Sequence, residues 1–446
     1  MKWLRTISWP LFAGGFLITL GAASTCWAQD PGTEIDSGAT AWLLASSALV
    51  LFMTPGLALF YAGMVRSKNI LGTMMHSIFC MGIVTIQWVL IGYSISFGDS
   101  VNGLFGNITT HAFLNGVPFD KPFPDTQIPH MLFMTFQMMF AIITPALITG
   151  AFAERVRFGP YVLFILLWTT LVYDPIAHWV WGGGILSGNE EMWLYKLCGA
   201  GALDFAGGTV VHISSGVSAL IFCIMIGRRR GYPDQPILPT NLVITVLGAG
   251  ILWFGWFGFN GGSGLGSDGT AVSAFTVTHI CAAAAAVSWA AVEWLHRGKA
   301  SILGVATGLV AGLVCITPAS GFVEAMPALL MGLIVSPICY FFVAVLKSKL
   351  GYDDSLDAFG VHGIGGTVGA LLTGVFLSPL LNDGTGASFM QFKAQAIAVV
   401  VTWIYAAVVT VILVFLIDKT MGLRLSEDDE QSGLDLSQHG EVGSNP

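Results

Sequence analysis

Apolar residues occur along this chain in long runs that few polar residues interrupt. A helix that crosses a bilayer needs about 20 consecutive, mainly apolar residues. After the N-terminal segment, eleven stretches meet this requirement. They are residues 40–64, 72–97, 130–153, 159–183, 204–227, 241–261, 271–295, 302–321, 323–347, 359–379 and 392–418. The pattern predicts an all-α polytopic membrane protein with eleven transmembrane helices.

Lys and Arg are distributed unequally among the polar connections. The loops after odd-numbered stretches, together with the C-terminal tail, hold most of them, including Arg66 and residues 228–230. The loops after even-numbered stretches hold only Lys121, Lys196 and, at the edge of the last stretch, Lys393. Cytoplasmic loops are enriched in these residues. We therefore expect a protein of the cell inner (cytoplasmic) membrane, with the mature N-terminus outside and the C-terminus in the cytoplasm.

The two ends of the chain differ from the membrane domain, residues 29–418. Residues 1–28 begin with Lys2 and Arg5, continue as an apolar run and end on small residues, as a secretory signal peptide does. The alternative is a retained first transmembrane helix. Residues 419–446 form a polar, acidic tail, which we expect in the cytoplasm.

Composition narrows the class of function. Charged residues make up 10% of the chain, against about 25% in soluble domains. No basic surface for nucleic acid is evident, and the seven cysteines lack the spacing of a zinc site or a disulfide framework. We expect neither a cofactor nor a nucleic-acid partner; the lipid bilayer is the surrounding solvent.

Two segments of the chain repeat each other. Residues 204–212 and 354–362 align at an offset of 150 residues, which pairs His212 with His362. Both histidines lie in stretches apolar enough to cross a membrane, where ionisable groups are costly and mark substrate or proton paths. Because each half holds five stretches, the halves, about 40–227 and 241–379, enter the membrane from opposite sides. Such inverted repeats place a binding site or pore at their interface, and residues 392–418 lie outside the repeat.

Aromatic residues gather at the predicted outer ends of several stretches. Phe136 and Phe140 stand one helical turn apart, and Trp181 closes the fourth stretch. The sixth stretch ends with Phe259 and Ser263 among glycines that we expect to interrupt the helix and free its carbonyls. Aromatic faces, a hydroxyl and carbonyls suit a small cation that is losing its water. The alternative is an ordinary interfacial aromatic belt.

Four strings of residues resemble a known family. They are FYAGMVRSKN at 60–69, GAFAER at 150–155, DFAGGTVVH at 204–212 and DAFGVHG at 357–363. They are similar to the bacterial branch of the ammonium transporter (Amt/Mep/Rh) family, and the resemblance extends from about residue 36 into the tail. It implies homotrimers with one pore in each subunit.

The resemblance also implies roles for individual residues. Trp181, Phe136 and Ser263 would bind ammonium at the outer surface, with Asp204 as the buried acid beside them; a plain helix cap is the alternative for Asp204. The expected gate and pore pairs are Phe140 with Phe259, and His212 with His362. The tail would help a PII-type signalling protein to dock at the cytoplasmic pore exit.

Physical chemistry leads to the same expectation. An apolar pore penalises any bare cation, so ammonium that gives up its proton can cross as ammonia where potassium cannot. The sequence does not determine whether a proton crosses with each ammonia or whether methylammonium is also transported. The alternatives are an ammonium sensor with little flux and, more remotely, a membrane metalloenzyme that uses the two histidines.

Overall fold

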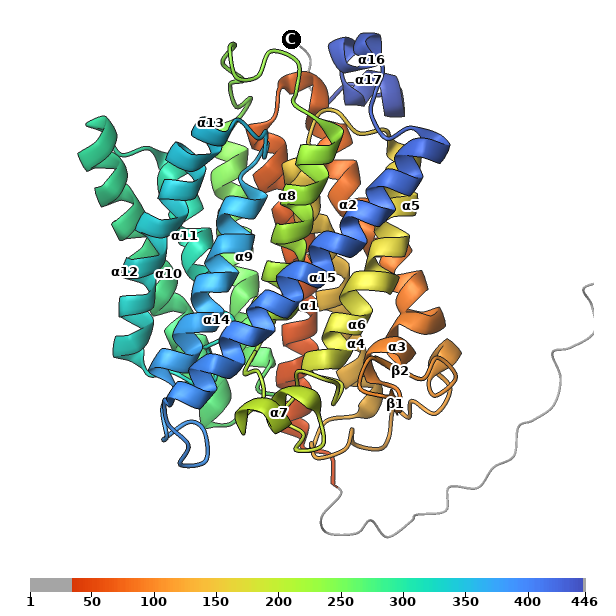
Figure 1. The fold of residues 1–446 in the computed structure, drawn as a ribbon, viewed down its shortest axis with the longest axis vertical. Coiled ribbons are helices and arrows are strands. Elements are labelled where there is room, and N and C mark those ends of the chain that lie inside the picture. Colours follow the sequence, from red (N-terminus) through yellow and green to blue (C-terminus); the bar gives the residue numbers. More distant parts are fainter. Residues whose placement is uncertain (1–33, 444–446) are drawn as a thin grey trace, which may run out of the picture.

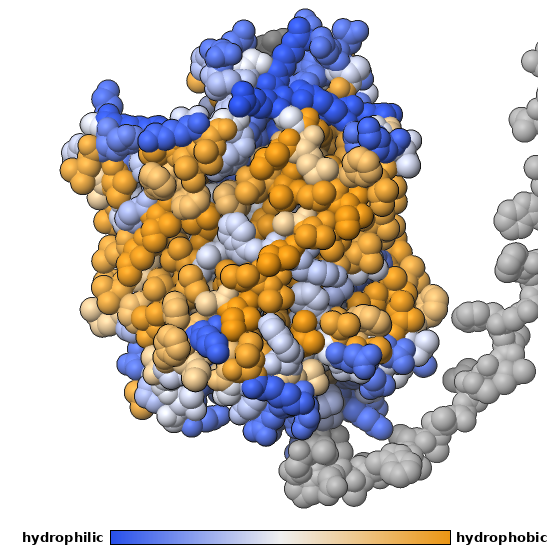
Figure 2. Space-filling view, viewed as in Figure 1, coloured by the Kyte–Doolittle hydropathy of each residue, from blue (hydrophilic) through white to orange (hydrophobic). Residues whose placement is uncertain are grey.

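The computed structural model describes residues 34–443, so the predicted signal peptide, residues 1–28, lies outside the described residues. The described chain forms a bundle of helices that run up and down between two polar ends (Figure 1). In Figure 2 a belt of apolar side chains covers the visible face of this bundle, with hydrophilic residues gathered at both ends. A belt of this kind is what a bilayer requires of a protein that crosses it.

Ten of the described helices are long and apolar enough to cross a membrane, and a shorter apolar helix, α11 (Ile302–Ile316), makes the eleventh. The ten are Ser37–Met64, Ser67–Phe97, His130–Ala151, Phe158–Val180, Gly208–Ile226, Leu242–Gly262, Gly269–Arg297, Ala325–Leu350, Phe359–Phe376 and Phe389–Met421. Each lies within a few residues of a predicted stretch. The prediction of an all-α polytopic membrane protein is confirmed.

Several spans are continuous helices and others change pitch along their length. The continuous ones are α1 (Ser37–Met64), α9 (Leu242–Gly262), α10 (Gly269–Arg297) and α15 (Phe389–Met421). The composite ones are η1 (Ser67–Asn69), α2 (Ile70–Gln87), η2 (Trp88–Gly92) and α3 (Tyr93–Phe97); α4 (His130–Ile148) and η4 (Thr149–Ala151); α5 (Phe158–Trp168), η5 (Thr169–Tyr173) and α6 (Asp174–Val180); η6 (Gly208–Ile213) and α8 (Ser214–Ile226); α12 (Ala325–Tyr340), η7 (Phe341–Leu346) and α13 (Lys347–Leu350); and η8 (Phe359–Gly363) and α14 (Ile364–Phe376). The η segments within spans are mostly π-helical, a form frequent at functional sites.

Short elements close the end of the bundle opposite the C-terminal tail. A two-stranded antiparallel ribbon pairs β1 (Ser100–Val101) with β2 (Phe105–Gly106), and η3 (Ala112–Leu114) and α7 (Trp193–Cys198) lie in the same polar layer. The hydropathy pattern did not indicate these elements, because none is long or apolar.

The two halves meet along pairs of equivalent helices. The first spans of the halves, α1 and α9, pack against each other, and α8 packs on η8 while α14 packs on η6. The crossing is close at two equivalent glycines. A Cβ at Gly216 would lie 2.1 Å from the backbone nitrogen of Gly363, and one at Gly366 would lie 2.9 Å from the carbonyl oxygen of Gly208. Only residues without a side chain allow this approach.

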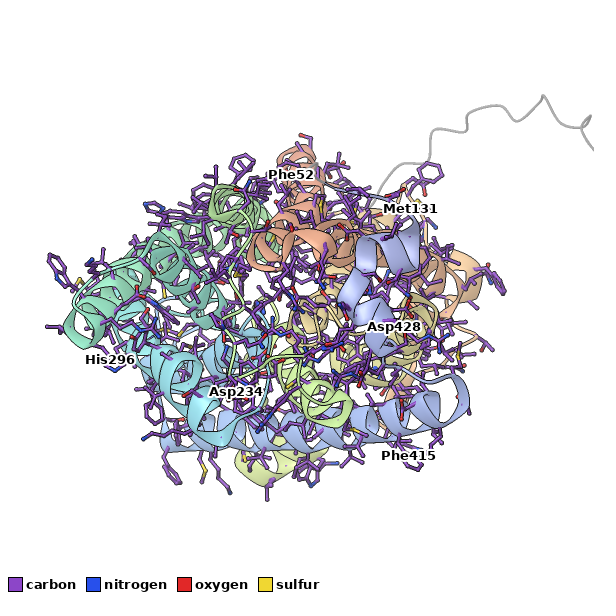
Figure 3. All side chains as sticks on the ribbon, turned by 90° about the horizontal axis from the view of Figure 1, so that it is seen from above. Phe52, Met131, Asp234, His296, Phe415 and Asp428 are labelled. Atoms are coloured by element: carbon purple, nitrogen blue, oxygen red, sulfur yellow. The ribbon has the colours of Figure 1, made fainter. Side chains whose placement is uncertain are left out.

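The last span and the tail lie outside the repeat. Helix α15 crosses the bundle obliquely along one flank, as Phe415 indicates in Figure 3. It packs against α5, α8 and α14. The tail helices α16 (Glu427–Ser432) and α17 (Leu434–His439) fold back over one end of the bundle, where Asp428 is labelled.

One expectation about the sixth span is wrong. Its glycines do not interrupt the helix, because α9 continues through Gly262 and ends at Ser263. The glycines allow close packing instead: a Cβ at Gly255 would lie 2.2 Å from Met53, and one at Gly262 would lie 2.8 Å from Phe136. Only the last turn has free carbonyls, and that of Gly261 accepts a hydrogen bond from the Trp42 indole at 3.1 Å.

Candidate functional site: an apolar passage with a histidine pair

The two repeat histidines meet at the centre of the bundle. His212 lies in η6 and His362 in η8, and their Nδ1 atoms are 3.3 Å apart. One nitrogen must carry the hydrogen and the other must accept it, because a neutral imidazole has one N–H. Both rings are almost wholly buried. The Nε2 atom of His212 has no hydrogen-bond partner within residues 34–443.

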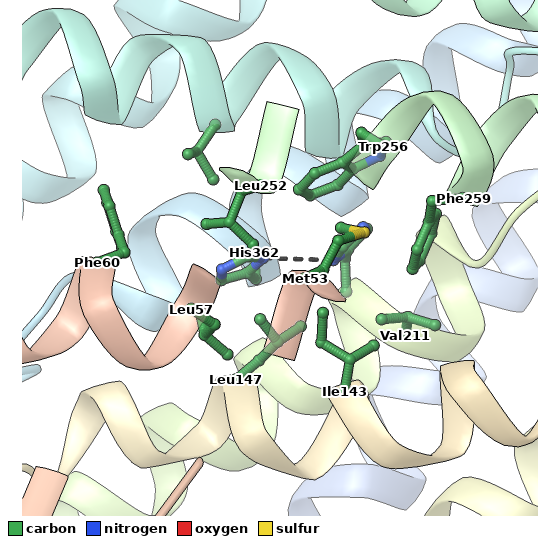
Figure 4. Close-up of a pocket in the computed structure, with 12 residues that line it drawn as sticks. Met53, Leu57, Phe60, Ile143, Leu147, Val211, Leu252, Trp256, Phe259 and His362 are labelled. Carbon is green, nitrogen blue, oxygen red and sulfur yellow. Dashed lines mark hydrogen bonds between the residues drawn. The ribbon is translucent and has the colours of Figure 1, made fainter. Parts of the chain in front are cut away.

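The histidine pair faces a narrow apolar cavity (Figure 4). The space left there is about 10 Å³, comparable to what one water molecule needs. Apart from the two histidines, its wall is made of apolar and aromatic side chains: Met53, Leu57, Phe60, Ile143, Leu147, Val211, Leu252, Trp256, Phe259 and Val310. Such a wall offers a bare cation no replacement for its water.

Aromatic rings stack on the pair from one side. The His212 ring lies parallel to those of Trp256, at 5.4 Å between centroids, and Phe259, at 6.0 Å. Phe259 in turn contacts Phe140 at 4.3 Å. Both phenylalanines are about 1% exposed, so their rings close the passage between the histidines and the space beyond.

That space is an open vestibule of about 310 Å³. Phe140 forms part of its wall, and Trp181 stands edge-on to Phe140 at 6.0 Å. Ser263, which caps α9, also lines it and donates its hydroxyl hydrogen to the carbonyl of Phe259 at 2.8 Å. The serine oxygen therefore remains free to accept a hydrogen bond. Three of the residues predicted from sequence are thus brought together at one cavity.

Phe136 lies behind this wall. It is fully buried and packs edge-on against Phe140 at 5.0 Å, and it is not among the residues that line the vestibule. The α4 side chains that do line it are Phe133, Gln137 and Phe140. A direct contact between Phe136 and a substrate stays a prediction; its observed contact is support for the Phe140 ring.

The carboxylate of Asp204 accepts four backbone hydrogen bonds, from the nitrogens of residues 207–210, at 2.6–3.0 Å. These are the contacts of a helix cap. Trp181 donates its indole hydrogen to the backbone oxygen of Asp204 at 2.8 Å. Asp204 therefore holds the start of η6 through its carboxylate and one wall of the vestibule through its backbone oxygen. An effect of its charge on a cation stays a prediction.

Asp354 has the equivalent position in the second half. Its carboxylate accepts from the nitrogens of Ala358 and Phe359 at 3.0 and 2.9 Å, at the start of η8. Burial, with the charge of Asp357 adding to it, raises the pKa of Asp354 to about 6. Sequence reasoning aligned Asp204 with Asp354 but gave Asp354 no role. The shared spacing of eight residues to each histidine was the available signal.

A second cavity continues the passage toward the end that carries the tail. Phe60, Val310 and His362 line both this cavity and the histidine cavity. Asp357 lines it as well and forms an ion pair with Lys347. Asp357 therefore both lines this cavity and holds a structural ion pair.

Buried ion pairs join the loops at the tail end. Asp353 receives two hydrogen bonds from the Arg229 guanidinium, at 2.8 and 2.9 Å, and lies 3.6 Å from Arg155. Burial would raise the pKa of Asp353, but the hydrogen bond and charge of Arg229 and the charge of Arg155 outweigh it and lower the pKa below its usual value. Glu154 pairs with Arg66 at 2.6 Å.

Within residues 34–443, no group of three or more His, Cys, Asp or Glu is placed to hold a metal ion. The histidine pair therefore has no third ligand from the described chain. The fold and the passage define a class: a polytopic membrane protein in which a vestibule, an aromatic closure and a histidine-lined apolar cavity follow one another between two inverted halves.

Comparison with known proteins gives the family. The model of the Ammonium Transporter Family matches residues 41–444. The chain is 44% identical to an ammonium transporter of Aquifex aeolicus, over 97% of this chain and 99% of that one. It is 47% identical to an ammonium transporter of Bacillus subtilis, over 91% and 98%. This chain therefore belongs to the ammonium transporter family.

Solved structures agree with this assignment. The fold is similar to the crystal structure of Saccharomyces cerevisiae Mep2, with a TM-score of 0.79 and 33% identity over 89% of both chains. It is also similar to a structure described as a sensor Amt protein, with a TM-score of 0.81 and 29% identity over 90% of this chain and 98% of the other. The matching family and the relatives in Aquifex aeolicus and Bacillus subtilis are named as ammonium transporters, which is a class of transport protein.

Proposed function

We propose that this protein carries ammonium nitrogen across the cell inner membrane by binding ammonium, removing its proton and conducting ammonia. Ammonium enters the vestibule beside Trp181 and Ser263. The aromatic faces attract it as a cation, and the Ser263 oxygen accepts one of its hydrogens.

The observation that carries this proposal is one uninterrupted series of rings. Trp181, Phe140, Phe259, His212 and His362 follow one another with centroid distances of 4.3–6.0 Å. The series begins in the vestibule and ends in the apolar cavity. An ion with its water cannot fit this cavity and a bare ion is penalised there, whereas neutral ammonia is not.

The histidine pair then provides hydrogen-bond partners for ammonia. Ammonia both donates and accepts hydrogen bonds, and the unpartnered Nε2 of His212 supplies one polar contact inside the apolar wall. Because the Nδ1–Nδ1 hydrogen bond has a direction, exchange of its hydrogen would also move a proton between the rings. Whether that step accompanies each ammonia decides between charge-moving transport and passive conduction.

A flux measurement tests this proposal. Purified protein in liposomes that contain a pH-sensitive dye would be mixed rapidly with ammonium chloride. Ammonia that enters without a proton takes up protons inside, so with passive conduction the internal pH should rise faster than in protein-free liposomes; if a proton accompanies each ammonia, an ammonium-evoked current should appear instead. An internal pH rise equal to that of empty liposomes, together with no ammonium-evoked current, would contradict the proposal.

Ammonium sensing is a second candidate, favoured by the similarity to the sensor Amt protein. A sensor would bind ammonium in the same vestibule and pass little ammonia. Saturable ammonium binding with neither the internal pH change nor an ammonium-evoked current would select it.

We also propose, from the family resemblance, a homotrimer with the C-terminus in the cytoplasm, where residues 419–446 regulate the pore and meet a PII-type signalling protein. The tail has the contacts that such a role needs: Arg424 donates to the backbone oxygens of Ile226 and Arg228, at 3.0 and 2.7 Å, and pairs with Glu430 at 3.0 Å. It thus joins the ends of the two spans α8 and α15.

A further inference from the structure

We propose that Gln137 is a further ligand of the cation in the vestibule, through its side-chain carbonyl oxygen. The inference rests on the proposed function, because it assigns to the ammonium-binding step a residue that neither the sequence motifs nor the comparisons single out.

The position of Gln137 follows from helical geometry. Phe133, Gln137 and Phe140 are spaced by four and then three residues on α4, and side chains at these spacings share one helix face. All three line the vestibule. The amide therefore lies between two aromatic rings, one helical turn from the ring that closes the passage.

The oxygen of this amide has no partner. Gln137 is 9% exposed, and its Oε1 makes no hydrogen bond to any residue the structure describes. A buried carbonyl oxygen without a donor is unfavourable, so most such atoms are paired with protein, water or ligand. Once the amide is turned so that this oxygen faces the vestibule, a cation there would supply the missing donor.

The other lining groups explain why a donor-only ligand fits. Besides Gln137, the lining residues with polar side-chain atoms are Ser263 and Trp181. The indole hydrogen of Trp181 is already given to Asp204, and the hydroxyl hydrogen of Ser263 to Phe259. The Ser263 oxygen can still accept a hydrogen bond.

Ammonium carries four N–H donors and no lone pair, so two acceptor oxygens and aromatic faces suit it. Gln137 also carries an NH₂ group, and rotation about its last side-chain bond exchanges the two ends of the amide. Turned with its oxygen toward the vestibule, Gln137 adds a second oxygen to that of Ser263. An anion would meet mainly acceptors and ring faces there.

Three variants test the inference. Gln137→Leu removes the carbonyl at similar size, and Gln137→Glu keeps an acceptor oxygen and adds charge. Gln127→Leu makes the same change in the neighbouring outer pocket formed by the loops at residues 122–127 and 264–268, and serves as the matched control. Each would be measured in proteoliposomes as ammonium-evoked current or internal pH change against ammonium concentration.

We expect the ammonium KM to rise about tenfold or more in Gln137→Leu, the factor for losing a hydrogen bond to a charged partner. The maximal rate should stay near that of the unmodified protein, because the pore is unchanged. Gln137→Glu should keep a KM at or below the original value, and Gln127→Leu should not alter it.

The failures can be told apart. An unmodified protein without saturable ammonium transport would contradict the proposed function itself. Normal transport with an unchanged KM in Gln137→Leu would overturn only the role of Gln137. If Gln137→Leu does not fold, Gln137→Glu decides: a KM raised tenfold there, despite the retained oxygen, would mean that Gln137 is a packing residue and overturn the inference.

Discussion

His212 and His362 meet through the same ring atom, Nδ1, at 3.3 Å, although they lie 150 residues apart in the chain. The repeat makes this contact nearly symmetric, but the hydrogen between the two nitrogens cannot be shared equally by two neutral rings. The ring that donates has a bare Nε2, and the ring that accepts carries its hydrogen on Nε2. The pair therefore presents one acceptor and one donor along the passage.

The histidine pair should set selectivity. In His212→Ala or His362→Ala, the cavity gains space for water, so potassium should enter and the ammonium-to-potassium current ratio should fall by at least about tenfold, or 1.4 kcal/mol. His212→Asp should lower the ratio as well, since a carboxylate can hold a cation. Unchanged exclusion of potassium in both Ala variants would refute the pore assignment.

Phe136 and Phe140 should differ in what their loss does. Phe136 is fully buried behind the vestibule wall, so Phe136→Ala should lower the unfolding free energy by about 3–5 kcal/mol, as cavity-forming substitutions do. Its effect on KM should be small. Phe140→Leu, which removes a lining ring, should raise the KM. Thermal unfolding and flux measured on both variants would reveal a reversed pattern if Phe136 contacts substrate.

Asp204 can be tested against its structural equivalent. Asp204→Ala would leave four buried backbone N–H groups unpaired and should cost about 3 kcal/mol or more. Asp204→Asn, which retains one oxygen, should fold with a smaller loss. Asp354→Asn makes the same change in the other half. A KM increase in Asp204→Asn but not in Asp354→Asn would show that the charge of Asp204 contributes to cation binding. If the two variants have the same KM, the role of Asp204 is that of a helix cap.

Asp353 should make stability depend on pH. Its pKa in the folded protein lies below the usual value near 3.8 because of Arg229 and Arg155. Its contribution should therefore be complete above about pH 5 and disappear as pH falls through the folded-state pKa. Asp353→Asn, which leaves Arg229 only its longer contact with Glu154 at 3.8 Å, should cost about 3 kcal/mol at pH 7. A difference between the two proteins that did not shrink toward pH 3 would argue against this role.

The tail contact can be weakened at one residue. Glu430 is buried and pairs with Arg424, whereas Glu427, in the same short helix, is exposed. Glu430→Gln should release the tail, seen as faster proteolysis after residue 421, and should change flux regulation without abolishing the pore. Glu427→Gln is the control and should match the unmodified protein. Equal rates of proteolysis in both variants would mean that the tail is an ordinary solvated acidic segment.

The membrane spans and the repeat could be predicted because they depend on long-range composition and on matching residues. Runs of apolar residues determine the spans, and the shared offset of 150 residues pairs the two histidines that the fold brings together. The short elements β1, β2 and α7 were not predicted, because neither hydropathy nor length distinguishes them from loops.

The vestibule face of α4 could not be inferred from the sequence. Phe136 and Phe140 share a turn spacing, but so do Phe133 and Gln137, and the packing of α4 within the bundle, chiefly on α1, α2 and α8, determines which side chains face the space. Gly262 illustrates the reason. Its missing Cβ lets the Phe136 ring lie against α9, and nothing local to residue 136 encodes that partner.

The most direct test of the account is a current measurement on a solid-supported membrane. Proteoliposomes would receive an ammonium pulse, with an equal potassium pulse as control, for the unmodified protein and for His212→Ala and His362→Ala. The account predicts a response to ammonium alone in the unmodified protein, as current or, if conduction is passive, as internal pH change, and loss of that selectivity in both variants. An equal response to potassium in the unmodified protein, or variants that keep full selectivity, would contradict it.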